Sequence, residues 1–494
     1  MKILIYLTAA GLNPHMGVLL DEAEKYIQEG HDVTVLSCDK TIGCCLSNPT
    51  QQAAICLSCK LQKKFLVHKL SKRVKIYDIN QFHKGVVFPE FHYKSILDLK
   101  KIEYKGIDIG YAVVSTYVTL TRNLNPKFDE SYYHLINEFL KSSVILTEAL
   151  IQAIKEIKPD RICLSNGRLF ETKPALRLGQ QNNIETYVYE VTGISPNFRT
   201  VYFINTLPHD IQYNTQLIND FWNNSKQIID EKIKIGEDFY KKKKLGIAVN
   251  DVSYTASQNI GQLPEGWDKT KMNIVIFNSS EDEFVAIGEE YEKKIFPSQI
   301  EGMEYILSEN VDRNDIHFYI RIHPNLKKIQ YKYHLDIYKF AEYSNCDIIP
   351  ADSPVSTYSL IDNANKIIAF GSTTGIEACF WNKPVILLST TFYSNLDVAY
   401  LPQDKEELQE LIREPILKPK SIIGALKYGY YSSDMRGQKF QYFNYNFSNY
   451  KQISEYKTIF GSNKLYRYFF SVFHIVSKIN RKFGLDKGIP LNEE

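Results

Sequence analysis

The sequence contains no uninterrupted apolar run of about 18 residues, the length that a transmembrane helix needs. Its 59 lysines and arginines nearly balance its 57 aspartates and glutamates, so the formal net charge is only +2. A charge so close to neutral gives no basis for broad nucleic-acid binding. Eight cysteines in 494 residues are too few for a secreted disulfide scaffold. These absences favour a cytoplasmic protein without nucleic-acid partners.

The sequence also lacks the G-x-G-x-x-G fingerprint of dinucleotide-binding domains, although its start is typical of a βαβ unit. The stretch "KILIYLTAA" at residues 2–10 predicts a buried strand, and residues 18–29 predict an amphipathic helix that ends at Gly30. A second strand, "HDVTVLSC", follows at residues 31–38. Because strand, helix and strand follow one another at once, we interpret the start as folded structure and not as a signal peptide.

Strands alternate with helices along most of the chain, which predicts parallel sheets covered by helices. A second α/β series begins with "MNIVIF" at residues 272–277, and 494 residues suffice for two domains. We therefore predict two doubly wound Rossmann-like domains, residues 1–244 and 245–430, with a helical extension over 431–494. The first domain is predicted to end in a charged helix whose last four residues, Lys241 to Lys244, form a solvated face or linker.

Polar residues follow four predicted strands of the second domain. In doubly wound domains, ligands bind outside the carboxyl ends of the strands, so these loops should meet at one edge. Each loop alone is equally compatible with helix capping, whereas the four together favour a ligand site. Their sequences are "NSSEDE" at 278–283, "RIHPN" at 321–325, "DSPVSTY" at 352–358 and "GSTTG" at 371–375.

Small hydroxyl residues at a helix start leave room for a phosphate and donate to it, which points to Ser372 and its neighbours. Glu377 comes one helical turn later, and a carboxylate repels phosphate, so we expect it to accept hydrogen bonds from ribose or sugar hydroxyls. His323 and Arg321 point to the same side of an extended chain. Histidine there could donate to a phosphate or cap the turn that Pro324 begins.

These motifs resemble those of bacterial surface-polysaccharide glycosyltransferases of the GT-B fold, and of capsular polysaccharide biosynthesis proteins in particular. The pair formed by "RIHPN" and "FGSTTGIEACFWNKPVI" is similar to the carboxyl-terminal half of that family, and the resemblance extends over residues 1–430. Further matching stretches are "SSEDE" (279–283), "PSQ" (297–299), "DSPVSTYSL" (352–360), "SNGR" (165–168), "KP" (173–174) and "YEVTG" (189–193).

The resemblance implies an enzyme that transfers a sugar from a nucleotide-activated donor to a saccharide or glycolipid acceptor, with its two domains facing one another across a cleft. It implies that His323, Ser372 and Thr373 bind the phosphates of a CMP-, UDP- or GDP-linked sugar. The predicted donor-site residues are Ser279, Ser280, Glu281, Arg321, His323, Asp352, Ser353, Tyr358, Gly371, Ser372, Thr373, Thr374 and Glu377.

On the acceptor side, a carboxylate that takes the proton of the acceptor hydroxyl is needed. Glu190 follows a strand and ranks first, with Glu171 and His15 as alternatives. Arg168 would neutralise donor phosphate or an acidic acceptor, beside Asn166. The predicted catalytic residues are Glu190, His323 and Arg168, and the acceptor-side residues are His15, Asn166 and Arg168. Alternatives of the same architecture are a nucleotide-sugar epimerase, a polyol-phosphate transferase and a non-catalytic carbohydrate-binding subunit.

Five of the eight cysteines lie close together in one predicted loop. Cys56 and Cys59 have the C-x-x-C spacing of half a metal site, and Cys38 with Cys44 or Cys45 could supply the other half. Cys45 is the second ligand that the resemblance implies. Four thiolates predict zinc, with an iron–sulfur cluster or reduced thiols as the alternatives. Cys163, Cys346 and Cys379 are predicted to be small core residues.

A second amphipathic segment lies near the carboxyl terminus, at residues 464–483. Lysines and arginines flank its apolar face, so the helix would either lie on the inner surface of an anionic membrane or pack on the first domain. The apolar face consists of Leu465, Phe469, Val472, Phe473, Val476 and Ile479.

Overall fold

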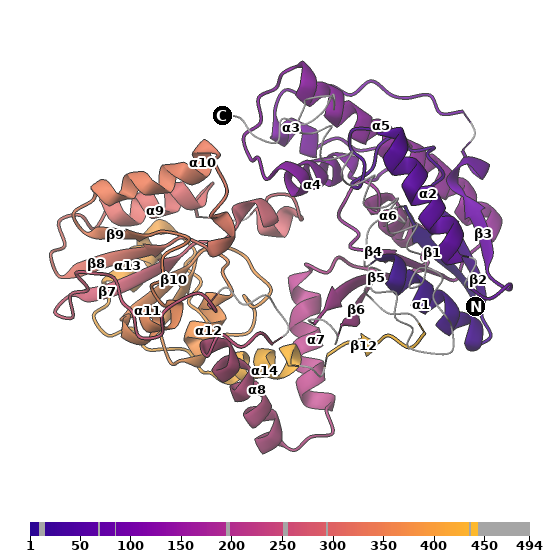
Figure 1. Cartoon of the computed structure of the whole chain (residues 1–494). Coiled ribbons are helices and arrows are strands. Elements are labelled where there is room, and N and C mark those ends of the chain that lie inside the picture. The colour runs from indigo at the N-terminus through magenta and orange to yellow at the C-terminus, as the bar shows by residue number, and fades with distance from the viewer. Residues whose placement is uncertain are drawn as a thin grey trace. The chain divides into compact units, whose positions relative to one another are not determined.

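The computed structural model describes residues 1–8, 15–67, 70–83, 85–193, 198–249, 255–292, 295–433 and 436–442 (Figure 1). The chain divides into two compact units. Within the described residues, unit 1 contains 1–192, 198–208 and 437–442, and unit 2 contains 193, 209–433 and 436. The predicted helix at 464–483 lies outside the described residues.

The boundary expected after residue 244 differs from this division, because two helices before it belong to unit 2. These helices, α7 (Ile211–Asn224) and α8 (Ile229–Lys244), both contact α14 (Ile423–Ser432). The backbones of α8 and α14 approach so closely that a Cβ atom on Gly429 would lie 2.7 Å from the carbonyl oxygen of Gly236. The absence of side chains at Gly236 and Gly429 therefore lets α8 pack closely against α14 of the second unit.

Unit 1 contains a seven-stranded sheet in the order β12-β6-β5-β4-β1-β2-β3. The strands β1 to β5 pair in parallel, whereas β5 pairs with β6 and β6 with β12 in antiparallel fashion. The strands are β1 (Lys2–Leu7), β2 (Asp32–Ser37), β3 (Lys75–Asp78), β4 (Arg161–Ser165), β5 (Glu185–Thr192), β6 (Arg199–Ile204) and β12 (Gln438–Lys439). The helices are α1 (His15–Gln28), α2 (Ala53–Val67), the 3-10 helix η1 (Ile79–Gln81), α3 (Ile96–Lys100), α4 (Ile109–Thr121), α5 (Glu130–Ile157) and α6 (Lys173–Gln181).

Unit 2 contains a five-stranded parallel sheet in the order β11-β10-β7-β8-β9. The strands are β7 (Met272–Phe277), β8 (Ile316–Arg321), β9 (Cys346–Ile349), β10 (Lys366–Ala369) and β11 (Val385–Leu387). Besides α7, α8 and α14, the helices are η2 (Glu281–Glu283), η3 (Glu289–Tyr291), α9 (Gln299–Ser308), η4 (Pro324–Leu326), α10 (Lys332–Leu335), η5 (Asp336–Glu342), α11 (Thr357–Asn363), α12 (Thr374–Phe380) and α13 (Lys405–Arg413).

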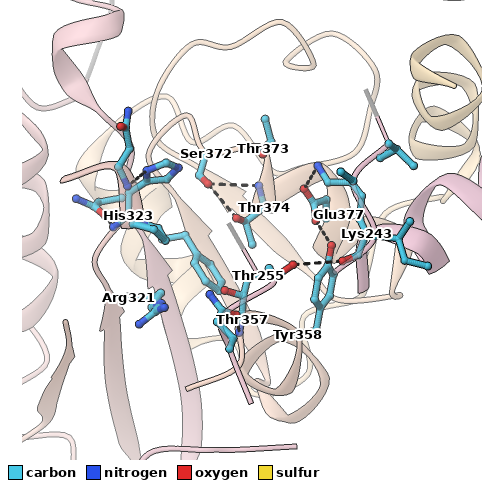
Figure 2. A pocket seen from close by; sticks show the side chains of 18 of the residues that line it. Lys243, Thr255, Arg321, His323, Thr357, Tyr358, Ser372, Thr373, Thr374 and Glu377 are labelled. Atoms are coloured by element: carbon cyan, nitrogen blue, oxygen red, sulfur yellow. Dashed lines mark hydrogen bonds and ion pairs between the residues drawn. The ribbon is translucent and has the colours of Figure 1, made fainter. Parts of the chain in front are cut away.

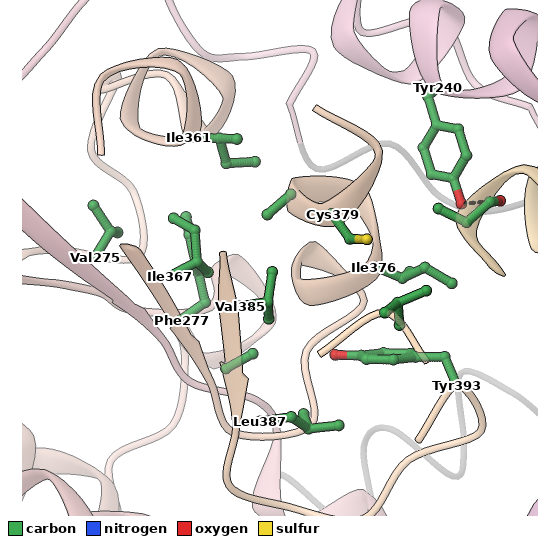
Figure 3. Close-up of a cluster of buried hydrophobic side chains, with 14 of the residues drawn as sticks. Tyr240, Val275, Phe277, Ile361, Ile367, Ile376, Cys379, Val385, Leu387 and Tyr393 are labelled. Atoms are coloured by element: carbon green, nitrogen blue, oxygen red, sulfur yellow. Dashed lines mark hydrogen bonds between the residues drawn. The ribbon is translucent and has the colours of Figure 1, made fainter. Parts of the chain in front are cut away.

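Both faces of the unit 2 sheet are buried, which explains why its strands are apolar at successive positions. Val275 and Phe277 of β7 belong to the core that includes α11 and α12 (Figure 3), whereas Ile274 and Ile276 belong to a second core with α9. Tyr240 anchors α8 at the edge of the first core and donates a hydrogen bond to the carbonyl oxygen of Ala425 at 2.8 Å.

The β1 strand of unit 1 is likewise buried along its length, with Ile3, Ile5 and Leu7 in the core that includes α1. The predicted fold class, an α/β protein with two Rossmann-like units, is confirmed. Among the described helices, none combines the length and the apolar character that a membrane span requires.

Candidate functional site

A cavity of about 560 Å³ lies in unit 2 where β7, β8 and β10 end (Figure 2). The last residues of β7 and β8, Phe277 and Arg321, reach its wall. The cavity thus occupies the ligand position that parallel α/β sheets offer at their carboxyl edge. Seven of the predicted donor-site residues line it: Arg321, His323, Tyr358, Ser372, Thr373, Thr374 and Glu377.

Arg321 brings a buried positive charge to this wall, since the residue is only 3% exposed. Its Nη1 atom donates to the carbonyl oxygen of Pro350 at 2.7 Å, and Nη2 donates to that of Ser353 at 3.2 Å. Within the described part of the chain, Nε has no hydrogen-bond partner and the guanidinium makes no ion pair. Burial lowers the pKa of Arg321 to about 10, and the nearby charge of Asp352 offsets only part of this effect.

His323 is oriented by the turn that follows β8. The backbone N–H of Asn325 donates to Nδ1 of His323 at 3.2 Å, so the proton of a neutral ring resides on Nε2. The backbone N–H of His323 donates in turn to Oδ1 of Asn278 at 2.7 Å, which ties the loop after β8 to the loop after β7. Both loops thus hold His323 on the cavity wall as a hydrogen-bond donor.

The loop between β10 and α12 supplies three adjacent hydroxyl residues. Gly371 begins it with a φ of 80°, a conformation that residues with side chains rarely adopt. The Ser372 hydroxyl donates to Oγ1 of Thr374 at 3.0 Å and accepts from the Thr374 backbone N–H at 3.3 Å. Tyr393 donates to the carbonyl oxygen of Ser372 at 2.5 Å. The loop is therefore braced before any ligand enters.

Glu377 lies in the same cavity and is 6% exposed. Figure 2 shows Tyr358 and Lys243 pointing toward its two carboxylate oxygens from different elements. The Tyr358 hydroxyl donates to Oε2 at 2.5 Å, and Nζ of Lys243 lies 2.8 Å from Oε1. Burial, and then the charge of Glu377, raise the pKa of Tyr358, so the phenol stays protonated and donates.

The remaining predicted donor-site residues do not line the cavity but brace or flank it. Ser279 exchanges hydrogen bonds with Gln299, and Ser280 accepts from Nδ2 of Asn325 at 3.2 Å. Glu281 accepts from the backbone N–H of Gln299 at 3.4 Å. Ser353 contributes its carbonyl oxygen to Arg321. Asp352 is exposed beside Lys327, and Gly371 shapes the turn described above.

Lys243 is a functional candidate that the lysine run alone does not indicate, because the run Lys241 to Lys244 predicts a solvated face or linker. The helical period does indicate it, because Lys243 follows Phe239 by four residues and Tyr240 by three and therefore shares a helix face with these two buried residues. Its side chain is 19% exposed, against 53% for Lys241. Thr255 and Gln258 also line the cavity and lie outside the predicted ligand loops, whereas Asn325 and Thr357 belong to two of those loops without being predicted individually.

Two of the predicted acceptor-side residues, Asn166 and Arg168, lie on one turn in unit 1 beside Glu190. Asn166 and Gly167 both have positive φ angles, which turn the chain sharply after β4. Nδ2 of Asn166 donates to Oε1 of Glu190 at 2.9 Å, and Nη2 of Arg168 donates to Oγ1 of Thr119 at 3.4 Å. Burial raises the pKa of Glu190. The side chain of His15 lies outside the described part of the structure.

Glu171, the second candidate base, is buried within unit 1 and holds the cysteine-rich segment to the sheet. Its carboxylate accepts from the Thr8 hydroxyl at 2.7 Å and from the backbone N–H of Leu46. Burial raises the pKa of Glu171. Through these contacts the carboxylate connects Thr8, the residue after β1, with Leu46, which is a structural role.

The predicted metal site is not supported, because no three metal-ligating side chains converge anywhere in the described residues. None of the eight cysteines, all of which lie in the described residues, forms a disulfide, and the partners of their thiols differ: Nδ2 of Asn48 donates to Cys56 at 3.2 Å, and the backbone N–H of Lys40 donates to Cys38 at 3.3 Å. Burial raises the pKa of Cys38 to about 12 and also raises that of Cys45, so both favour the thiol form. Cys59 is partly exposed, and Cys163, Cys346 and Cys379 are buried as predicted.

Residues 232–407, less than half of the chain, match the family described as capsule polysaccharide biosynthesis protein. This segment includes the whole unit 2 sheet and the cavity residues discussed above. The predicted resemblance to that family is confirmed over the matched segment. No curated protein sequence matches the chain.

Solved structures of low similarity include two transferases and an epimerase. The beta Kdo 2,4 transferase KpsC of Thermosulfurimonas dismutans is 13% identical over 54% of this chain and 78% of its own, with a TM-score of 0.35. The beta Kdo 2,7 transferase KpsC of the same organism is 14% identical over 57% and 79%, with a TM-score of 0.32. The UDP-GlcNAc 2-epimerase from Neisseria meningitidis, bound to UDP-GlcNAc, is 12% identical over 87% and 98%, with a TM-score of 0.28. With TM-scores this low, these likenesses carry no argument about function.

Proposed function

We propose that the chain is a cytoplasmic glycosyltransferase that transfers a sugar from a nucleotide-activated donor to a saccharide or glycolipid acceptor of a bacterial surface polysaccharide. The observation that carries the proposal is the buried Arg321, which lines the cavity and makes no ion pair with the described residues, although the charge of Asp352 acts on it from farther away. A buried charge without an ion-pair partner is costly, so an anionic ligand would supply what this wall lacks. The family match over 232–407 supports polysaccharide synthesis as the context.

Sugar transfer requires stabilisation of the negative charge that develops on the nucleotide leaving group. His323, Arg321, Ser372 and Thr373 line the same cavity, and their imidazole, guanidinium and hydroxyl groups suit phosphate oxygens. Glu377 keeps the proposed contact to ribose or sugar hydroxyls. CMP-, UDP- and GDP-linked sugars all remain candidate donors.

The acceptor hydroxyl must lose a proton, and we assign this role to Glu190. A carboxylate whose pKa is raised by burial binds a proton more readily at neutral pH than an exposed one. Asn166 orients this carboxylate, and Arg168 on the same turn is the proposed contact for an acidic acceptor or for donor phosphate.

The test is a comparison of His323→Ala with His317→Ala. His317 lies near the start of β8, the strand that precedes His323, contacts Asp347 at 3.0 Å and does not line the cavity, so it controls for the loss of a nearby imidazole. Loss of a charge-assisted hydrogen bond of about 1.5–3 kcal/mol predicts a roughly 10- to 150-fold fall in kcat/KM for His323→Ala only.

The assay offers CMP-, UDP- and GDP-sugars to the purified full chain, with and without oligosaccharide acceptors, and separates the products. Transfer to an acceptor supports the glycosyltransferase, whereas sugar epimerisation without an acceptor would establish the epimerase alternative. Turnover by His323→Ala equal to that of His317→Ala would remove His323 from the donor site.

A further inference from the structure

A buried carboxylate lies beside the loop that we propose as the phosphate site. Glu377 follows Thr373 by one helical turn, and its backbone N–H donates to the Thr373 carbonyl oxygen at 3.3 Å. Side chains four residues apart on a helix lie about 5–6 Å from one another. A phosphate held by Ser372 and Thr373 would therefore lie close to the Glu377 carboxylate.

This proximity is unfavourable unless the carboxylate is neutralised. Two like charges about 6 Å apart repel strongly at the effective dielectric constant of about 20 that suits protein sites, enough to weaken binding on the order of a hundredfold. Tyr358 does not supply the compensation, because its hydroxyl donates a hydrogen bond but carries no charge. The ammonium group of Lys243, 2.8 Å from Oε1, does supply it.

We propose that Lys243 is the counter-charge that lets a phosphate-bearing ligand bind beside Glu377, and that it acts as a positioning residue through this ion pair. The inference rests on the proposed function of the cavity as a nucleotide-sugar site. Lys243 reaches the cavity from α8, which the sequence had assigned to the other domain. The donor site would then depend on a helix that precedes the strands β7 to β11 and the loops that follow them.

The surroundings of Lys243 hold its side chain in place. Its Nζ atom lies 5.5 Å from the centroid of the Phe239 ring, and its carbonyl oxygen accepts from the Thr255 hydroxyl at 3.4 Å. The helix itself is fixed by the contact between Gly236 and Gly429. The ammonium group is thus positioned in advance of ligand binding, which lowers the entropic cost of using it.

The experiment measures dissociation constants by calorimetry on the full chain for CMP, UMP and GMP and for the matching nucleosides. Lys243→Met should weaken binding of the monophosphate about a hundredfold, by the repulsion worked out above, and change nucleoside binding less than about threefold. Lys243→Arg keeps the charge and should preserve both affinities. Lys242→Met, at an exposed position of the same helix, controls for the change in total charge.

The double variant Lys243→Met/Glu377→Gln decides the mechanism, because it removes both charges and leaves no unpaired buried ion. It should recover monophosphate binding to within about fivefold of the wild type, whereas a purely structural role of Lys243 gives no such rescue. The inference is overturned if Lys243→Met weakens the binding of nucleoside and monophosphate equally. It is also overturned if the double variant does not recover monophosphate binding. Absence of monophosphate binding by the wild type instead overturns the proposed donor site, and this inference with it.

Discussion

Replacing Arg321 with methionine should separate ligand binding from folding. The guanidinium is buried, and within the described part of the chain its hydrogen bonds go to the carbonyl oxygens of Pro350 and Ser353. Its Nε atom has no partner among the described residues. Such a cation is unfavourable in the empty protein and becomes useful when an anion enters the cavity. Methionine has similar length, no charge and a flexible apolar side chain that fills the vacated space.

The magnitudes for the empty protein nearly cancel. Burial, partly offset by the charge of Asp352, lowers the pKa of Arg321 from 12.5 to about 10, which corresponds to a net cost of about 3 kcal/mol for the charged form at neutral pH. The two hydrogen bonds from the charged group contribute roughly 1.5 kcal/mol each in the opposite direction. We therefore expect Arg321→Met to change the free energy of unfolding by no more than about 1 kcal/mol. Loss of the phosphate contact should weaken monophosphate binding roughly 10- to 150-fold.

Urea unfolding with and without a nucleoside monophosphate measures both quantities. A ligand that binds only the folded state raises the free energy of unfolding, by about 2.7 kcal/mol at 100 times its dissociation constant. Wild type should show this increase, and Arg321→Met should lose most of it. A fall of more than about 3 kcal/mol in the unliganded variant would identify Arg321 as a structural residue. Full retention of the ligand-induced increase would refute its role in anion binding.

Two further predictions concern the framework. Gly429→Ala should destabilise the chain in urea unfolding, because the added Cβ would lie 2.7 Å from the Gly236 carbonyl oxygen. The steric cost of such overpacking, about 1–3 kcal/mol, exceeds the roughly 1 kcal/mol that alanine gains over glycine in helix propensity. Gly288→Ala, with nothing within 4 Å of its Cβ, should change the free energy of unfolding by less than about 0.5 kcal/mol, and equal effects of the two would refute the steric argument. Burial raises the pKa of Glu22 from 4.5, so its contribution to stability is present below 4.5 and is lost as the pH rises through the raised value. Glu22→Gln should therefore flatten the decline in the free energy of unfolding above pH 4.5, and an unchanged pH profile would contradict this.

The α/β class could be predicted because local patterns report it. Both faces of β7 are buried, so its sequence is a continuous apolar run followed at once by polar residues, as a covered parallel strand requires. The unit boundary could not be predicted in the same way. It depends on the contact between Gly236 and Gly429, which lie far apart in the chain, and neither glycine carries a local signal of its partner.

Much of the cavity wall was predictable for a geometric reason. Parallel strands end at one edge, so Arg321, His323 and the loop from Ser372 to Thr374 meet there whatever the details of the helices. The same reasoning predicts too many lining residues, because a loop at a strand end also contains residues that only hold the loop in place. Ser279, for example, accepts a hydrogen bond from the Gln299 side chain and does not line the cavity.

The contacts of the two acidic candidates argue for different roles. Lys243 and Tyr358 each contact one oxygen of Glu377, and the remaining lone pairs of this carboxylate can accept hydrogen bonds from ribose or sugar hydroxyls. Glu190 has an amide, Asn166, as its hydrogen-bonding partner, and burial raises its pKa, which favours proton uptake. An acid held by a lysine is suited to balancing charge beside a phosphate, whereas an acid held by an amide is suited to accepting a proton. The catalytic base should therefore be sought at Glu190 in unit 1.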